Sequence, residues 1–168
     1  MARRFRGSET YRMDAKGRVS IPAPFRRVIE AGDPDWSPDK RPNIVIVYGG
    51  PERNWLEVYT MEAVYEIDEQ IDMMQRGTQE RAEIEELMYA QSHQTEIDPD
   101  GRLVLPQKLR EKIGLKSDVY FASAGTSFRI WDPETYAAEQ ASVAAERAQT
   151  RPPHYDPLIN LPKLGGSQ

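Results

Sequence analysis

Cysteine is absent from the 168-residue chain, and histidine occurs only twice, as His93 and His154. Without cysteine there are no disulfides, no iron–sulfur clusters and no zinc sites with cysteine ligands. The two histidines lie far apart in the sequence, and neither has the spacing of a metal ligand. We therefore expect no metal ion and no other cofactor.

Long apolar runs are also missing. No stretch approaches the roughly 20 residues that a membrane-spanning helix needs. The basic start, MARRFR, is not followed by an apolar stretch, which argues against a secretory signal. The expectation is a cytoplasmic protein that does not bind membranes.

The usual signatures of catalysis are not recognisable. The sequence shows no nucleophile paired with a base, no glycine-rich loop for phosphate and no metal constellation. Asp98 and Asp100 lie close together, but they belong to a turn and are typical of solvated carboxylates. We predict that the chain is not an enzyme and has no small-molecule substrate.

Charge is distributed unevenly along the chain. The net charge of −5 argues, as an average, against DNA binding. Residues 1–27, however, hold eight basic residues against Glu9 and Asp14, a net charge of +6, whereas residues 57–90 have a net charge of −8. A phosphate-binding surface needs local positive charge, not a positive total. Charge alone leaves two interpretations of the N-terminus open, a DNA contact and a solvated arm.

One sequence element occurs twice. Residues 13–26, MDAKGRVSIPAPFR, align with residues 97–110, IDPDGRLVLPQKLR, at a constant offset of 84. A second pair follows at an offset of 72, in which residues 56–62 resemble residues 128–134. The first copy therefore carries 12 extra residues, which we assign to the Gly/Pro/Asp-rich loop 32–42.

Two similarities in the same order predict a duplicated module. We place the first module at residues 1–77, the second at residues 78–149, and a flexible tail at residues 150–168. Buried or half-buried strands are expected at 43–48, 56–59, 119–121 and 128–131, and helices at 61–90 and 133–149. Gly17 and Gly101 are expected in turns with positive φ. The fold class is mixed β with helices.

The Asp-x-x-Gly-Arg element suggests a chemical role. The aspartate can accept hydrogen bonds from turn amides and can pair with the arginine four residues later. An arginine held in this way is the commonest reader of guanine, through O6 and N7 in the major groove. The alternative is an ion pair that only stabilises the turn, although an exposed pair contributes only about 0–1 kcal/mol. Arg26 and Arg110 are equally compatible with salt bridges and with phosphate contacts.

The two elements, together with FRG at residues 5–7 and FRIW at residues 128–131, resemble the MraZ family over roughly residues 1–140. The resemblance implies two SpoVT-AbrB-type modules that form a swapped-hairpin (double-split) β-barrel flanked by α-helices. It also implies a nucleoid-associated, ring-like homo-oligomer. Its partner would be double-stranded DNA. The protein would act, usually as a repressor, on G-rich direct repeats upstream of its own operon in the division and cell-wall gene cluster.

The expected DNA-binding residues come from the two turns and the N-terminal arm. They are Arg4, Arg6, Arg12, Asp14, Lys16, Arg18, Asp98 and Arg102. The chain departs from the family pattern in having Asp100 where the first copy has Lys16, and Arg129 where the family usually has an acid. We therefore expect the first turn to contribute more to DNA binding than the second.

A different class of function is an AbrB-type protein-interaction module, as in antitoxins of this fold. The tail segment 151–162, RPPHYDPLINLP, has apolar residues that could hold a protein partner. The duplication within one chain fits DNA binding better.

Overall fold

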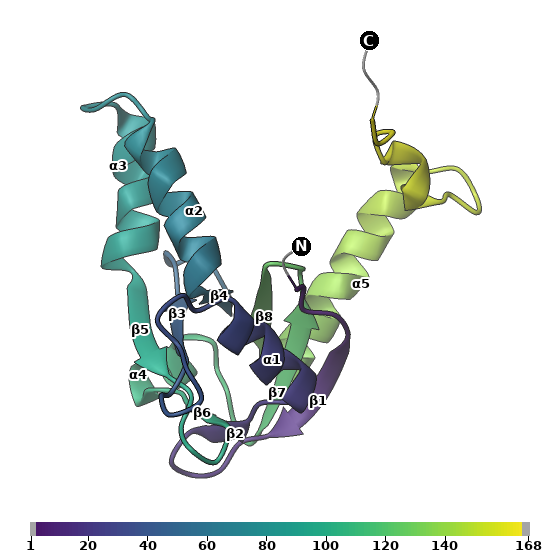
Figure 1. The fold of residues 1–168 in the computed structure, drawn as a ribbon. Coiled ribbons are helices and arrows are strands. Elements are labelled where there is room, and N and C mark those ends of the chain that lie inside the picture. Colours follow the sequence, from purple (N-terminus) through teal and green to yellow (C-terminus); the bar gives the residue numbers. More distant parts are fainter. Residues whose placement is uncertain (1–2, 166–168) are drawn as a thin grey trace. The chain divides into compact units, whose positions relative to one another are not determined.

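The computed structural model describes residues 3–165, which form two compact units, 3–136 and 137–165. The first two residues of the predicted first module and the last three of the predicted tail lie outside the described residues. Both copies of the repeated element lie in the first unit (Figure 1). Its elements are β1 (Ser8–Arg12), β2 (Arg18–Ser20), α1 (Ala23–Ala31), β3 (Asn43–Val47), β4 (Trp55–Thr60), α2 (Met61–Asp72), α3 (Gln79–Glu85), η1 (Glu86–Ala90), β5 (Ser92–Glu96), β6 (Arg102–Val104), α4 (Gln107–Lys112), β7 (Asp118–Ser123) and β8 (Ser127–Trp131).

Six strands form one antiparallel sheet in the order β1-β7-β8-β4-β3-β5. This order reflects the duplication, because β5 begins 84 residues after β1 and each of the two occupies an edge. Each of these edge strands pairs with a strand of the other module: β1 pairs with β7, and β5 pairs with β3. The predicted mixture of strands and helices is confirmed. The order is linear, with β1 and β5 at opposite edges, so closure into the expected barrel is not confirmed.

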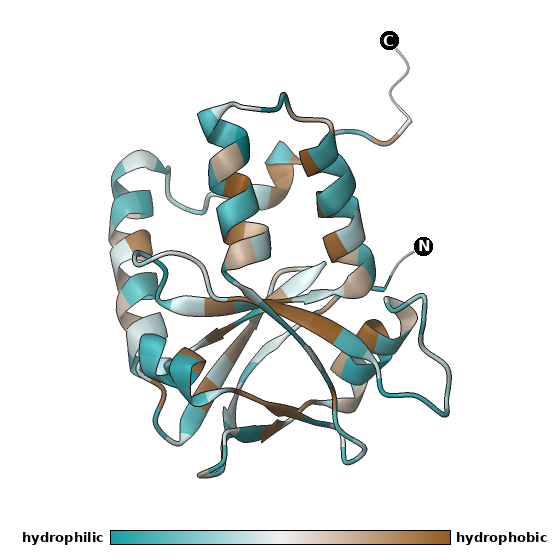
Figure 2. Cartoon of the chain, turned by 90° about the vertical axis from the view of Figure 1, so that its left-hand side faces the viewer, coloured by the Kyte–Doolittle hydropathy of each residue, from teal (hydrophilic) through white to brown (hydrophobic). Residues whose placement is uncertain are grey.

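The remaining strands, β2 and β6, pair with each other as a short antiparallel ladder. Val19 and Leu103, which occupy equivalent places in the two copies, lie directly opposite each other and are fully buried. They join a core that both modules build, in which Phe25, Phe121 and Phe128 pack with ring centroids between 4.9 and 6.3 Å apart. Figure 2 shows apolar residues on the strands and mostly hydrophilic helices. The two repeats therefore share one core.

The opposite face of β3 carries Val45 and Val47, and the predicted helical stretch 61–90 covers it. Ile71 and Met88 provide the buried apolar side chains of this helical layer. Thr78 caps α3, since its side chain accepts a hydrogen bond from the Arg81 amide at 3.3 Å. The break between α2 and α3 at Gly77 and the cap at Thr78 are confirmed.

Arg129, one of the two departures from the pattern that the resemblance implies, balances a buried charge on this face of the sheet. Glu57 is buried, and its carboxylate lies 3.4 Å from the Arg129 Nε and 3.8 Å from Arg53 Nη1. Burial and the Glu57 charge raise the pKa of the adjacent Tyr59 to about 12. A second acid at position 129 would place like charges together out of water, which is costly.

The second unit contains most of the helix α5 (Pro133–Thr150) and the one-turn helix η2 (Pro157–Asn160). The Asp156 side chain caps η2 by accepting a hydrogen bond from the Leu158 amide at 3.0 Å. The Arg151 guanidinium lies over the Tyr155 ring at 4.2 Å. Within the described residues, no helix combines the length and the apolar composition needed to cross a membrane.

Candidate nucleic-acid interface

The first turn is organised by the carboxylate of Asp14. Its Oδ1 accepts hydrogen bonds from the backbone amides of Lys16 at 3.0 Å and Arg18 at 2.9 Å, and its Oδ2 accepts from Arg18 Nε at 2.6 Å. The backbone hydrogen bond from Arg18, followed by its side chain and the Lys16 amide, holds the pKa of Asp14 below its ordinary value. Asp14 therefore remains ionised at neutral pH and fixes the direction of the Arg18 side chain.

The second turn repeats this geometry. Asp98 accepts hydrogen bonds from the amides of Asp100 at 2.9 Å and Arg102 at 2.8 Å, and from Arg102 Nε at 3.2 Å. Gly17 and Gly101 have φ of +83° and +75°, as the sequence predicts. Both turns thus orient an arginine by the same set of hydrogen bonds.

The two arginines nevertheless differ in what remains available to a ligand. Arg102 also donates from Nη2 to Asp100 Oδ2 at 3.0 Å, so that two carboxylates hold its guanidinium. Among the described residues, the Arg18 side chain bonds only to Asp14, through Nε, and its terminal amino groups have no protein acceptor. Asp100, which stands where the first copy has Lys16, therefore lowers the local positive charge and also occupies the guanidinium of Arg102.

The ladder of β2 and β6 places both arginines on one surface. Arg18 lies opposite Val104, and Ser20 lies opposite Arg102. Because side chains alternate along a strand, all four point away from the core face that Val19 and Leu103 occupy. The outer face of this two-stranded ribbon is the candidate interface, which we call the ribbon face (Arg18, Ser20, Arg102 and Val104).

Each turn is held by the opposite module. The amide of Leu105 donates to the Gly17 carbonyl at 2.8 Å, and the amide of Ile21 donates to the Gly101 carbonyl at 2.9 Å. Space beside the glycines is filled in the same crossed manner, because Arg110 lies against Gly17 and Arg26 lies against Gly101. The distance between the two turns is therefore set by the fold.

For Arg26 and Arg110, the structure bears on one of the two roles that the sequence left open, the salt bridge. Arg110 Nε donates to the Leu105 carbonyl at 3.0 Å. Within residues 3–165, neither arginine forms an ion pair with a carboxylate. Each adds positive charge to the turn of the other copy. The sequence signal for this contact with the opposite turn is that both copies have an arginine at the equivalent position.

The other basic residues expected to bind DNA divide into two groups by their position in the structure. Arg12 ends β1 directly before the first turn, and Lys16 lies in that turn; both are exposed. Arg4 and Arg6 precede β1, near the β7–β8 hairpin, where the Phe5 amide donates to the Gly125 carbonyl at 2.7 Å. A five-residue strand spans roughly 17 Å, so the structure does not bring Arg4 and Arg6 to the turns.

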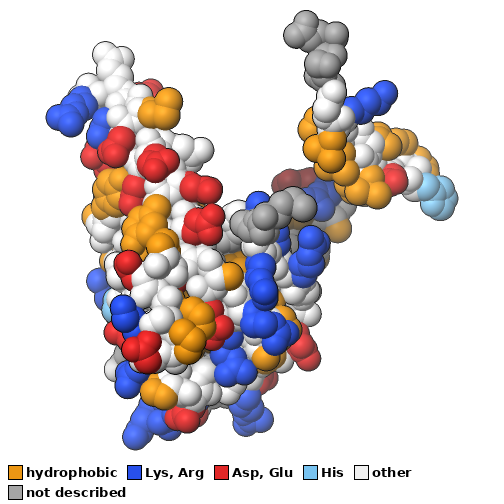
Figure 3. Space-filling model, in the orientation of Figure 1, with side chains coloured by type: hydrophobic (Ala, Val, Ile, Leu, Met, Phe, Trp, Pro, Cys, Tyr) orange, Lys and Arg blue, Asp and Glu red, His pale blue; other side chains and the backbone are white. Residues whose placement is uncertain are grey.

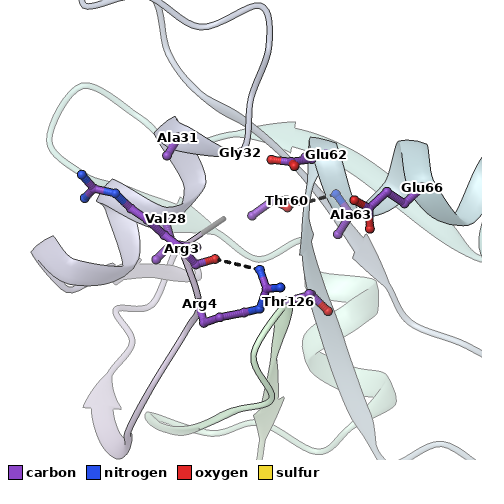
Figure 4. Close-up of a pocket in the computed structure, with 10 residues that line it drawn as sticks. All are labelled: Arg3, Arg4, Val28, Ala31, Gly32, Thr60, Glu62, Ala63, Glu66 and Thr126. Carbon is purple, nitrogen blue, oxygen red and sulfur yellow. Dashed lines mark hydrogen bonds between the residues drawn. The ribbon is translucent and has the colours of Figure 1, made fainter. Parts of the chain in front are cut away.

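Arg4 lies instead at a pocket of about 420 Å³ between α1, the start of α2 and the β7–β8 hairpin. Figure 4 shows Arg3 and Arg4 on one side of this pocket and Glu62 and Glu66 on the other. Figure 3 shows two groups of Lys and Arg side chains on the first unit. One lies where Figure 1 places α1, and the other lies at the lower end, where Figure 1 places β2 and β6. Among the described residues, no three His, Asp or Glu side chains come close enough together to hold a metal ion.

The structure thus defines a protein of two interlocked repeats that presents paired Asp–Arg turns on one ribbon. A family model described as "MraZ protein, putative antitoxin-like" matches residues 88–152. The proteins named "Transcriptional regulator MraZ" from Ruegeria pomeroyi and Ruegeria sp. strain TM1040 are 50% and 47% identical to this chain over 167 residues, which is 99% of this chain and all of each relative. The namesake from Parvibaculum lavamentivorans is 35% identical over 92% of this chain and 89% of its own.

The chain belongs to the MraZ family. The resemblance inferred from the two repeated elements is confirmed. The relatives carry the name of transcriptional regulators and not of enzymes.

Replacement of Gly17 by alanine tests the crossed bracing of the turns. A non-glycine residue with positive φ costs about 1–2 kcal/mol, and a Cβ at Gly17 would also collide with the backbone carbonyl of Leu105. Gly77 is the matched control, since its φ is +81° and a Cβ there meets nothing within 4 Å. In urea denaturation, Gly17→Ala should lower the free energy of unfolding more than Gly77→Ala does. Equal losses would contradict the close contact between Gly17 and the second module.

Proposed function

We propose that this chain is a sequence-specific DNA-binding transcriptional regulator. It acts as a repressor on G-rich direct repeats upstream of its own operon, in the division and cell-wall gene cluster. The observation that most directly supports this proposal is the ribbon face, on which a carboxylate orients each of Arg18 and Arg102. The name of the relatives supports regulation of transcription. The operator and the sign of regulation rest on the family resemblance.

The proposed contact is insertion of the ribbon into the major groove, which admits a two-stranded β-ribbon. Arg18 donates from its terminal amino groups to O6 and N7 of a guanine, while Asp14 keeps the guanidinium in place. Arg12, Lys16 and Arg110 surround the same turn and contact phosphates independently of sequence. Bound to chromosomal DNA in this way, the protein is cytoplasmic and nucleoid-associated.

Loss of the Arg18 side chain should reduce both affinity and base preference. Arg18→Ala removes the proposed bidentate contact, so we expect binding to weaken by about 1–3 kcal/mol and the preference for guanine at one position to relax. Gel shifts at low salt with operator and guanine-substituted duplexes measure both effects. Arg76→Ala removes the same charge from an exposed site in the acidic helical layer and is the control. Operator binding by Arg18→Ala equal to that of wild type would exclude guanine recognition by this residue.

A ring-like homo-oligomer is part of the proposal. A single pair of turns makes few contacts, whereas an oligomer that engages several repeats gains from the high effective concentration of the later contacts. Duplexes with one, two and three repeats should therefore bind with steeply rising affinity, and the mass of the protein in solution should correspond to an oligomer. A monomeric mass, or one affinity for all three duplexes, would refute multivalent binding.

The tail favours a second candidate function, binding of a protein partner. Leu158, Ile159 and Leu161 are 66%, 70% and 66% exposed, which is unusual for adjacent large apolar side chains. A triple substitution of these residues by serine should leave DNA binding unchanged and abolish retention of a partner in a pull-down from lysate. Equal retention by both forms would exclude the tail as the partner-binding element.

A further inference from the structure

The long loop between α1 and β3 lies beside the second turn. It comprises residues 32–42, whereas its counterpart in the second module, between α4 and β7, comprises only residues 113–117. The last residue of the long loop accepts a hydrogen bond from the Ile97 amide at 3.0 Å. The loop and α1 line a pocket of about 350 Å³ together with the residues of the second turn, Asp98, Pro99 and Gly101. The long loop of the first module therefore lies against the turn of the second module.

The loop has a defined internal structure. Asp33 is buried, and its carboxylate accepts hydrogen bonds from the amides of Asp35 at 3.0 Å and Asn43 at 2.8 Å. At the other end, Trp36 Nε1 donates to the Lys40 carbonyl at 2.9 Å. These contacts hold the backbone on both sides of the exposed pair Lys40 and Arg41.

The cations around this pocket are less engaged than the acids. Asp98 is occupied by the turn amides and Arg102, and the Ser37 hydroxyl donates to Asp39 and lowers its pKa. Within residues 3–165, the ammonium group of Lys40 donates only to the Asp35 carbonyl, at 3.4 Å.

Neither Lys40 nor Arg41 forms an ion pair within residues 3–165, and Arg26 brings a third such cation. Among the described residues, Glu30 is the one acid lining this pocket whose carboxylate forms no hydrogen bond or ion pair. The surface thus offers positive charge to an external anion.

The second turn lacks such charge of its own. Asp100 replaces the lysine of the first copy and binds the guanidinium of Arg102 as well. A turn of this kind repels phosphate unless cations from elsewhere compensate.

We propose that Lys40 and Arg41 bind the phosphate backbone of double-stranded DNA beside the second turn, so that the long loop of the first module supplies the cations that the second turn lacks. This inference rests on the proposed DNA-binding function. The second turn then belongs to the DNA interface. Arg102 occupies the groove, while the loop and Arg26 contact the phosphate backbone of the DNA.

Contacts to phosphate predict a specific salt dependence. Each phosphate neutralised contributes a slope of about −0.9 to a plot of log binding constant against log salt concentration. The full-length Lys40→Gln/Arg41→Gln variant should therefore have a slope shallower by about 1–2, with the same fractional loss of affinity on operator and on scrambled duplex DNA. The matched control, Arg76→Gln/Lys163→Gln, removes two exposed cations from other parts of the chain and should keep the wild-type slope. Glu30→Gln removes the unpaired acid and should tighten binding, a gain that misfolding would not produce.

Fluorescence anisotropy with both duplexes at several salt concentrations measures these quantities. A slope and an affinity equal to those of wild type in the double variant would overturn the role of the loop, and so would a loss confined to the operator. If Arg18→Ala weakens operator binding in the same experiment, the proposed function stands without the loop. If wild type binds neither duplex, the proposed function and the inference both fall.

Discussion

The turn glycines are held by backbone hydrogen bonds from the opposite repeat, from the Leu105 amide to the Gly17 carbonyl and from the Ile21 amide to the Gly101 carbonyl. Each crosses from one repeat to the other, so neither turn has its final geometry without the opposite module. The strand exchange in the sheet follows the same rule, because β1 and β5 complete the sheet of the other copy. The ribbon face therefore depends on contacts from both repeats.

Within this common frame the two copies have diverged. Within the described part of the chain, the terminal amino groups of Arg18 have no protein acceptor, whereas Arg102 is held by two acids. In the proposed account, the first turn reads bases and the second is supported by cations from the first module. Divergence of this kind is inexpensive for the fold, since the changed residues lie on the exposed side of turns whose backbone hydrogen bonds are identical.

The sequence predicted those features that depend on local pattern. The repeat, the glycine turns, the buried strands and the helical layer 61–90 all follow from residue type and spacing. Strands β1 and β5 were not predicted, because their residues are mostly polar and show no alternation of apolar and polar side chains. The crossed contacts of Arg26 and Arg110 depend on how the two modules pack, which no single segment encodes. The distance of Arg4 and Arg6 from the turns has the same origin, since it depends on where β1 enters the sheet.

The central claim is that the two turns and the ribbon between them form one DNA-binding surface. Hydrogen–deuterium exchange with and without operator duplex tests it most directly, since bound DNA slows exchange of the amides that it covers. The account predicts protection in peptides spanning residues 13–20 and 97–104, with the acidic layer 61–90 unchanged. Protection confined to the helical layer or to the tail, with both turns exchanging as in the free protein, would contradict it.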